Sequence, residues 1–486
     1  MVWTRSHAAA AAALLVVLGT GPVRAQADRA ADRLGVQRLG RDILKELIET
    51  NTTLSAGSTT QAAEKMAARL VAAGFPAADV VVVGGAERRR NLVARLRAAP
   101  GATLKPVLFF AHLDVVEARR EDWSMDPFVL TERDGWFYGR GTLDVKGGAG
   151  TLITAFCAMK QHGVVPVRDL ILAVTADEEG GNDNGVAWLL QHRRDLIDAA
   201  YAINLDSGGP EIHGGPEPQA TRVTALEVQA AEKVFALFTL TVRNPGGHSS
   251  LPVKENAIYR LAAALGRLSS LTFPTRTNEI SRRYLAAMAS IATGPTAADM
   301  KAASAVPTDE AAATRLSAAS PFNNAILRTT CVATLLAGGH AENALPQMAK
   351  ATVNCRMLPD EKPADVLKAL TTAVADPQVE VAMIDPQPRP SPPSPLVPEV
   401  LAAIQGAAKA TWGEVPVIPF MEMGATDGLF LRNAGMPVYG VTGIAFDPED
   451  VRAHGRDERI LVRSYYEGID FIERVARAIG GAPPLP

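Results

Sequence analysis

The chain has 486 residues, of which 47% are hydrophobic and 21% are charged, and its formal net charge is −3. This length allows two domains that each bury a core of their own. Because the charges are balanced, the sequence offers no basic surface of the kind that binds nucleic acid, and we expect no nucleic acid partner.

The N-terminus has the pattern of a secretory signal peptide. A basic start with Arg5 precedes an apolar run at residues 8–18, and small residues at Val23 and Ala25 predict cleavage after Ala25. The alternative, an uncleaved membrane anchor, is disfavoured because the apolar run is shorter than the roughly 20 residues that span a bilayer. We therefore predict a signal peptide at residues 1–25 and an exported protein, periplasmic or secreted, without a stable membrane anchor.

The chain has three cysteines, Cys157, Cys331 and Cys355. They are too few for a scaffold built on disulfides and too scattered for a structural zinc site. In an oxidising compartment Cys331 and Cys355 pair if they lie on adjacent strands, and two buried free thiols are the equal alternative.

The first half of the chain alternates strand and helix patterns. A capping box at Ser58 and Gln61 predicts the start of a helix that stops at Gly74. Strands are predicted at 79–83, 91–96, 107–111, 170–175 and 200–205, and a further helix at 150–159. The run 107–111 has no polar residue, as in a strand covered on both faces. We therefore predict an α/β domain with a mixed, largely parallel sheet flanked by helices.

From about Val228 the pattern changes to that of a compact α+β unit. Strands are predicted at 235–242, 329–336, 349–357 and 379–384, with helices at 256–268 and 363–373. The Ala-rich segment at about 280–319 reads as an extra helical insertion, and the proline tract 385–395 as a stiff linker. The predicted domains are therefore a larger one at 26–225 and 390–486, and one inserted into it at 226–389.

Polar motifs follow the apolar strands, which is where open α/β sheets keep their sites. They contain His112 and Asp114, Asp144 in the Gly-rich loop 139–148, Glu178 and Glu179, Asp206, and His454 in the last loop. His112 and Asp114 share a face, so the carboxylate can orient the imidazole. Two adjacent glutamates that end a buried strand are costly without a positive partner.

Each motif alone has an ordinary interpretation, such as a hydrogen-bonded strand end, a turn aspartate or a solvated acidic turn. The loop 139–148 is not a P-loop, because no Gly-Lys-Ser/Thr follows at the required spacing. Together the motifs supply enough histidines and carboxylates for two metal ions that share one aspartate. Mixed nitrogen and oxygen ligands without thiolate favour two Zn²⁺ per chain, with Co²⁺ or Mn²⁺ as replacements, and disfavour calcium.

With these loops in this order, the sequence resembles the metallo-exopeptidase family of glutamate carboxypeptidase, aminoacylase, acetylornithine deacetylase, succinyl-diaminopimelate desuccinylase and carboxypeptidase S. The resemblance runs from about Leu39 to the C-terminus, and its most specific pieces are His112-x-Asp114, Gly139-Arg-Gly-x-x-Asp144-x-Lys-Gly147 and Glu178-Glu179. It implies that one metal is held by His112, Asp144 and Asp206, and the other by Asp144, Glu179 and His454. Glu178 would then be the general base, and Asp114 would support His112.

The resemblance also assigns roles in the inserted domain, which would be a lid or dimerisation domain. His248, in Gly246-Gly-His-Ser-Ser, would reach the scissile carbonyl, in some relatives from a partner subunit. Asn343 and Arg356 would hold the carboxylate and carbonyl of the substrate. A homodimer through this domain is the expected assembly.

A last loop resembles the Gly-Gly-Thr-Asp-Ala segment of the family near the substrate carboxylate. Here it reads Gly424-Ala425-Thr426-Asp427-Gly428, so two residues differ from the commoner pattern. That difference weakens the assignment of Gly424 and Thr426 to substrate binding.

The function implied by the resemblance is a two-zinc hydrolase that cleaves an amide bond next to a free C-terminal carboxylate, as a carboxypeptidase or dipeptidase does. The alternative is an aminoacylase that hydrolyses N-acyl amino acids, with the insertion at 280–319 shaping an apolar entrance. A more remote alternative is a binding protein without catalysis, which would have lost Glu178 or a ligand, and none is missing. The side-chain preference stays open.

Overall fold

The computed structural model describes residues 21–213, 221–385 and 389–485. Residues 1–20, most of the predicted signal peptide, lie outside this range, so the signal peptide stays a prediction. The first described helix, α1 (Gly21–Ile48), runs across the predicted cleavage site. Among the described helices, none combines the length and apolarity that a membrane span needs.

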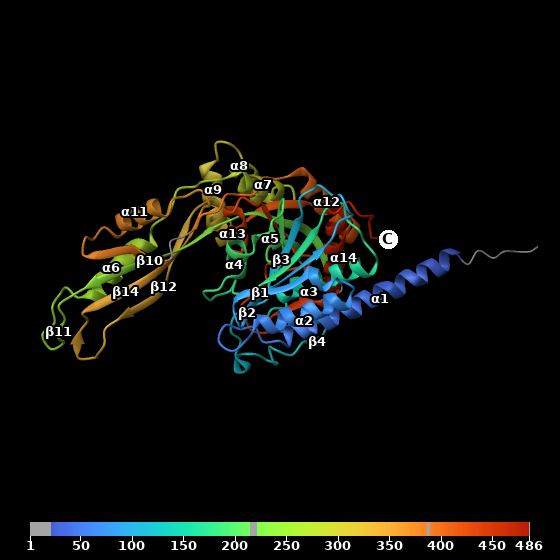
Figure 1. The fold of residues 1–486 in the computed structure, drawn as a ribbon. Coiled ribbons are helices and arrows are strands. Elements are labelled where there is room, and N and C mark those ends of the chain that lie inside the picture. Colours follow the sequence, from blue (N-terminus) through green and yellow to red (C-terminus); the bar gives the residue numbers. More distant parts are fainter. Residues whose placement is uncertain (1–20, 214–220, 386–388, 486) are drawn as a thin grey trace, which may run out of the picture.

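The larger domain is built on a nine-stranded mixed sheet between two layers of helices (Figure 1). Its order is β1-β2-β6-β3-β7-β17-β9-β16, with β8 paired to β9. The strands are β1 (Val80–Ala86), β2 (Arg89–Leu96), β3 (Val107–His112), β6 (Leu170–Thr175), β7 (Ala202–Asn204), β8 (Gly209–His213), β9 (Arg222–Glu232), β16 (Val417–Glu422) and β17 (Val438–Gly440). The central run β6-β3-β7-β17 is parallel, so the carboxyl ends of these strands meet at one edge of the sheet.

Helices cover both faces of this sheet. On one face α1 packs with α2 (Thr59–Ala72), α3 (Lys146–Gln161), α12 (Pro398–Trp412) and α14 (Val462–Ile479). The other face is covered by α4 (Gly185–His192), α5 (Arg194–Ile197) and α13 (Gly428–Asn433). The predicted capping box is confirmed in part: the Ser58 hydroxyl accepts a hydrogen bond from the backbone N–H of Gln61 at the start of α2, but the Ser58 backbone N–H donates to the Asn51 carbonyl.

Smaller elements complete this domain. A three-stranded sheet joins β4 (Thr131–Arg133), β5 (Trp136–Tyr138) and β18 (Arg459–Leu461), and the short 3-10 helices are η1 (Ala77–Asp79) and η2 (Arg120–Asp122). Since β5 precedes the loop 139–148 and β18 follows the loop of His454, this sheet brings the two loops together.

The smaller domain is a four-stranded antiparallel sheet with helices on one face, as predicted. Its strands, in the order of the sheet, are β12 (Thr330–Gly338), β14 (Met348–Met357), β10 (Val234–Arg243) and β15 (Val379–Met383). Its core lies between this sheet and the helices α6 (Ala257–Ser269) and α11 (Pro363–Val374). A short pairing of β11 (Gly247–His248) with β13 (Ala344–Leu345) forms the tip of the domain (Figure 1).

The pairing of the cysteines, which the sequence left open, is settled by the register of the small sheet. Cys331 on β12 lies opposite Cys355 on β14, and the two form a disulfide. Cys157 is a buried free thiol.

Two sequence-based boundaries need correction. Strand β9 stays in the large sheet as far as Glu232, so the chain enters the small domain at Lys233 rather than at 226. The helical insertion is longer than 280–319 and consists of α7 (Glu279–Met288), α8 (Gly294–Ala303), α9 (Glu310–Ala319) and α10 (Pro321–Leu327). It packs against β9 and β16 of the larger domain, because its apolar side chains share a core with Ala225 and Phe420.

The proline tract is packed where the structure describes it. Ser394 is buried, its hydroxyl donates to the Val438 carbonyl, and its backbone N–H donates to the Ala230 carbonyl. Residues 386–388 lie outside the described chain. The described end of the tract is therefore part of the large domain rather than a free linker.

Candidate metal centre and cavity

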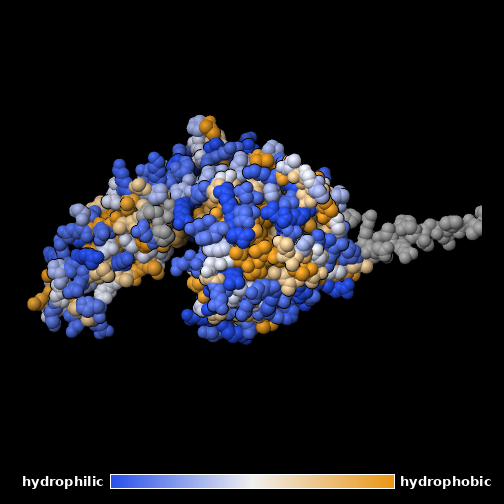
Figure 2. Space-filling model, viewed as in Figure 1, coloured by the Kyte–Doolittle hydropathy of each residue, from blue (hydrophilic) through white to orange (hydrophobic). Residues whose placement is uncertain are grey.

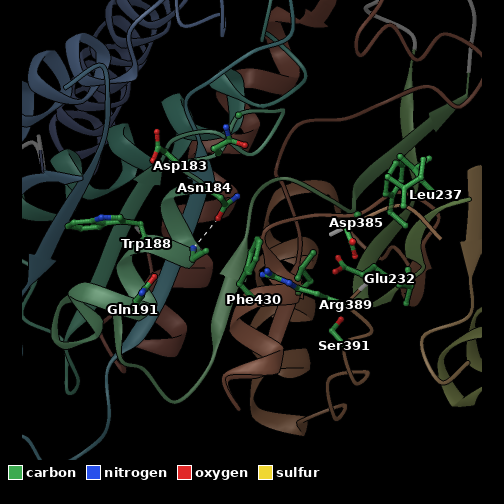
Figure 3. Close-up of a pocket in the computed structure, with 18 of the residues that line it drawn as sticks. Asp183, Asn184, Trp188, Gln191, Glu232, Leu237, Asp385, Arg389, Ser391 and Phe430 are labelled. Carbon is green, nitrogen blue, oxygen red and sulfur yellow. Dashed lines mark hydrogen bonds between the residues drawn. The ribbon is translucent and has the colours of Figure 1, made fainter. Parts of the chain in front are cut away.

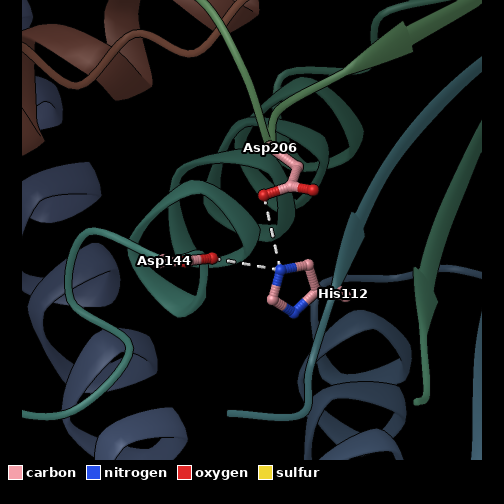
Figure 4. Close-up of side chains that lie close together, drawn as sticks. All are labelled: His112, Asp144 and Asp206. Atoms are coloured by element: carbon pink, nitrogen blue, oxygen red, sulfur yellow. Dashed lines mark ion pairs between the residues drawn. The ribbon is translucent and has the colours of Figure 1, made fainter. Parts of the chain in front are cut away.

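Two strand ends and one loop bring His112, Asp206 and Asp144 together (Figure 4). His112 ends β3, Asp206 follows β7, and Asp144 lies in the loop before α3. The Nε2 atom of His112 lies 3.2 Å from Oδ1 of Asp144 and 3.3 Å from Oδ1 of Asp206. The Nδ1–H donates to the backbone carbonyl of Asp114 at 3.0 Å, which directs Nε2 toward the two carboxylates.

A second group shares Asp144 with the first. The Nε2 atom of His454 lies 3.0 Å from Oδ2 of Asp144 and 2.9 Å from Oε2 of Glu179. In each group the potential ligand atoms lie within 4.8 Å of one another. Asp144 therefore directs one oxygen to each group, the arrangement expected of a carboxylate that bridges two metal ions.

The charges of the two groups favour added positive charge. Burial raises the pKa of Asp206, to about 7. Burial would lower the pKa of His112, but Asp206 and Asp144 outweigh it and raise that pKa well above its ordinary value. Hydrogen bonds with Asp144 and Glu179 raise the pKa of His454 to about 10. Carboxylates this crowded are stabilised by cations.

The donor set also fits a metal. Nε2 of His112 is buried and has no hydrogen-bond partner among the described residues. Mixed histidine and carboxylate donors without thiolate suit zinc and related divalent ions. The residues present therefore fit a pair of metal ions.

Asp114 holds the loop of the paired glutamates. Its carboxylate accepts hydrogen bonds from the backbone N–H groups of Glu178, at 3.1 Å, and Glu179, at 2.9 Å. It lies 3.7 Å from Nδ1 of His112, so the predicted orientation of the imidazole comes from the Asp114 backbone carbonyl instead. The Asp114 carboxylate bonds these two backbone N–H groups rather than the imidazole, because the N–H groups would otherwise be unpaired after a buried strand.

Glu178 lies beside the two groups without belonging to either. Burial, and then the charge of Asp206, raise the pKa of Glu178 well above its ordinary value. A carboxyl group with a raised pKa is suited to taking up and returning a proton near neutral pH.

A buried ion pair that the sequence reasoning missed supports both metal-ligand loops. The Glu458 carboxylate accepts hydrogen bonds from three backbone N–H groups of the loop 141–144, at 2.7 to 3.0 Å, and from Arg140 at 2.6 Å. Arg140 also donates to the backbone carbonyls of His454, at 3.3 Å, and Gly455, at 3.0 Å. Arg140 lies within the motif Gly139-Arg-Gly-x-x-Asp144-x-Lys-Gly147, and Glu458 is four residues after His454.

The metal groups open onto a cavity of about 480 Å³. Three of the predicted substrate-binding residues line it, Arg356 at the end of β14 and Gly424 and Thr426 after β16. The Arg356 guanidinium lies 4.8 Å from the ring centroid of Phe235. The same cavity has an apolar wall that includes Phe322, Phe420, Ile444, Phe446 and Val451.

The structure does not bring His248 and Asn343 to this cavity. They lie together at the tip of the small domain, where the backbone N–H of Ser249 donates to the Asn343 carbonyl at 3.0 Å. His248 is exposed, and its Nδ1 atom accepts a hydrogen bond from the backbone N–H of Ser250. The tip, at β11, points away from the strands that carry the metal groups (Figure 1).

A larger cavity of about 680 Å³ lies between the two domains (Figure 3). Its wall includes Trp188 of α4, Phe430 of α13 and Leu237 of β10, with Arg389 among its polar residues. The molecular surface has a notch between the two domains (Figure 2). None of the predicted metal ligands lines this cavity, and Ala425 borders both cavities.

Comparison with known proteins places these features in a family. The model of Peptidase family M20/M25/M40 matches residues 108–478. The chain is 31% identical over 385 residues to the human N-fatty-acyl-amino acid synthase/hydrolase PM20D1, covering 76% of this chain and 73% of that relative. It is 27% identical over 382 residues to the probable carboxypeptidase S-like 2 of Dictyostelium discoideum, covering 76% of this chain and 70% of that relative.

The fold is similar to that of the metallo-carboxypeptidase Sso-CP2 of Sulfolobus solfataricus. The TM-score is 0.67 at 18% identity, over 91% of this chain and 99% of that one. Both the sequence and the fold therefore have relatives among hydrolases.

Proposed function

Because the chain belongs to peptidase family M20/M25/M40, we propose that it is a two-zinc hydrolase that cleaves an amide bond next to a free carboxylate. The observation that carries the proposal is Asp144, whose two oxygens each face a separate histidine and carboxylate group. The first metal would be held by His112, Asp144 and Asp206, and the second by Asp144, Glu179 and His454. Co²⁺ or Mn²⁺ would be workable replacements.

Bound zinc would supply the positive charge that lowers the pKa of a water and polarises the scissile carbonyl. Glu178 would take a proton from the attacking water and deliver it to the amide nitrogen as the C–N bond breaks. The raised pKa of Glu178 supports this role, because the proton must stay on the carboxyl group between the two steps.

Recognition of the substrate carboxylate would fall to Arg356, with Gly424 and Thr426 beside it. A guanidinium offers a forked pair of N–H donors that matches a carboxylate. Its place in the wall of the metal cavity supports cleavage at the residue that carries the free carboxylate.

His248 and Asn343 would serve the site of a partner subunit in a homodimer. Within one chain they lie away from the cavity, while the edge strand β12 exposes Val332, Leu335 and Leu336 at 61%, 67% and 71%. An exposed apolar edge strand favours pairing with another chain. In the partner's site His248 would donate to the developing oxyanion, and Asn343 would hold the substrate. Export through the signal peptide at 1–25 belongs to the same proposal.

Two substrate classes fit this chemistry. A carboxypeptidase or dipeptidase needs only the metal centre and Arg356. An N-acyl amino acid hydrolase is favoured by the apolar wall of the cavity, to which the helical insertion contributes Phe322. A relative named as an N-fatty-acyl-amino acid hydrolase supports this second class. A binding protein without catalysis fits less well, because all five ligands and Glu178 are retained.

The test is hydrolysis of C-terminal dipeptides and N-acyl amino acids by one zinc-loaded preparation, before and after chelation. We expect chelator-sensitive release of the residue that carries the free carboxylate. Faster hydrolysis of the dipeptides or of the N-acyl amino acids decides between the two substrate classes. If neither set of substrates is hydrolysed after zinc is restored, the proposal is contradicted.

A further inference from the structure

One carboxyl group in the wall of the metal cavity has no partner among the described residues. Glu227 projects from β9, is only 8% exposed, and lines the cavity of about 480 Å³. Among the described residues, its carboxylate has no hydrogen bond or ion pair, and the only charged groups that act on it are the acidic Glu211 and Glu422. A carboxylate buried in this way is unfavourable unless a cation or donor comes from elsewhere.

The surroundings of Glu227 add negative charge rather than neutralise it. Glu211 and Glu422 lie near, and each has its own partner: His213 Nε2 lies 2.8 Å from Glu211, and the Ser207 hydroxyl donates to Glu422 at 2.7 Å. Burial, and then these two glutamates, raise the pKa of Glu227 to about 8. Near neutral pH the Glu227 carboxyl therefore holds its proton, and a cation bound beside it would favour the ionised form.

Among the described residues that line the cavity, no lysine or arginine fills this role. Arg356 is the only lysine or arginine among the described residues that line the cavity, and its guanidinium lies over the ring of Phe235. The metal ligands lie elsewhere in the wall, and Glu227 belongs to neither metal group. A cation that pairs with ionised Glu227 would therefore come from a bound molecule.

The wall around Glu227 is aromatic. Alternation along β9 places Glu227 on the same face of the sheet as Ala225, which the helical insertion covers. There Phe322 and Phe420 line the cavity, and Tyr284 meets Phe322 edge to face at 5.9 Å. An aliphatic stem packs well on such rings, and a cation at its end is attracted by their faces and by a carboxylate.

We propose that Glu227 ends a subsite for a cationic group of the substrate, a primary ammonium or guanidinium on an aliphatic stem. This inference rests on the proposed amide hydrolase and names its substrate class. The stem lies along Phe322 and Phe420, and the cation pairs with the Glu227 carboxylate. The source of the cation is a basic side chain, as in lysine, or the free amino terminus of a peptide.

The experiment compares matched substrates with the zinc-loaded full chain. N-acetyl-lysine and N-acetyl-norleucine differ in the side-chain ammonium, and glycyl-norleucine and N-acetylglycyl-norleucine differ in the amino terminus. We expect the cationic member of one pair to have the higher kcat/KM by roughly 10- to 100-fold, the range expected of a hydrogen bond to a charged group. The pair that shows the preference identifies the source of the cation.

Two variants locate the preference. In Glu227→Gln the ratio of kcat/KM within that pair should fall toward one, because the shape of the subsite is kept and its charge is removed. In the control Glu414→Gln the ratio should persist, since Glu414 is an exposed glutamate that does not line the cavity. A ratio near one in the unaltered protein, or the same ratio in Glu227→Gln, would overturn the proposal.

Binding to the zinc-loaded Glu178→Gln variant gives a readout that does not need turnover. Calorimetry should show tighter binding of the cationic compound, and the added change Glu227→Gln should abolish the difference. If no amide is hydrolysed but this difference is present, the hydrolase proposal fails and the cationic subsite stands. Equal binding of the compounds in both pairs would overturn the subsite.

Discussion

The metal centre and the tip of the small domain contain the two sets of residues that the family resemblance assigns to one reaction. At the metal centre, His112 and Asp206 lie at the carboxyl ends of parallel strands, and the loop before α3 adds Asp144 to form a largely buried cluster. At the tip, His248 and Asn343 are presented outward on two short strands. A parallel sheet can assemble a site within one chain, whereas an exposed pair of short strands is suited to completing a site outside its own domain.

The largest effect should come from Asp144, the residue that both groups share. Asp144→Asn should reduce metal content at both positions and lower hydrolysis by about 10³-fold or more, since water activation depends on the metals. Metal analysis and kcat/KM measure this. The surface change Asp195→Asn serves as control, and full metal occupancy with normal turnover in Asp144→Asn would contradict a shared ligand.

The next largest loss of activity should follow from a change of His248 at the tip of the small domain. His248→Ala should keep both metals and lose about 10²- to 10³-fold in kcat, as for removal of an oxyanion donor. Mixing it with Glu178→Gln under conditions of subunit exchange should restore activity, because the mixed dimer contains one site with both groups. If mixing restores nothing, His248 does not act in the partner's site.

The edge strand gives an independent test of the same arrangement. Leu336→Lys on β12 places a charge in the exposed apolar strip and should yield a monomer, since charged residues on edge strands oppose pairing. Light scattering would report the mass, and the monomer should bind metal yet show a loss similar to that of His248→Ala. A fully active monomer would refute the partner arrangement.

A smaller effect is expected at the buried pair that joins the two metal-ligand loops. Glu458→Gln keeps the shape but weakens the hydrogen bonds to the loop 141–144, and metal affinity should fall about 10- to 100-fold. Titration with a competing chelator measures this. Glu458→Gln with the affinity of the unaltered protein would show that the pair does not support the metal centre.

The sequence singled out the five candidate ligands: His112, Glu179 and Asp206 follow apolar strands whose ends meet, whereas Asp144 and His454 lie in loops and were assigned through the family resemblance. It did not reveal the link between Glu458 and Arg140, which depends on the closeness of two loops 318 residues apart. The predicted boundary at 226 came too early because strand patterns do not show which sheet a strand joins, and β9 remains in the large one. Glu227 gave no signal at all, since a glutamate in a strand is ordinary until its surroundings are known.

The most direct test of the account is metal content and turnover measured on one preparation of Glu178→Gln beside the unaltered protein. We predict about two zinc ions per chain in both, with kcat lower by about 10²- to 10⁴-fold in the variant, the range expected when a general base is lost. Near-normal turnover in the variant would remove Glu178 as the base. An unaltered protein that binds no zinc and cleaves no amide would contradict the two-metal hydrolase itself.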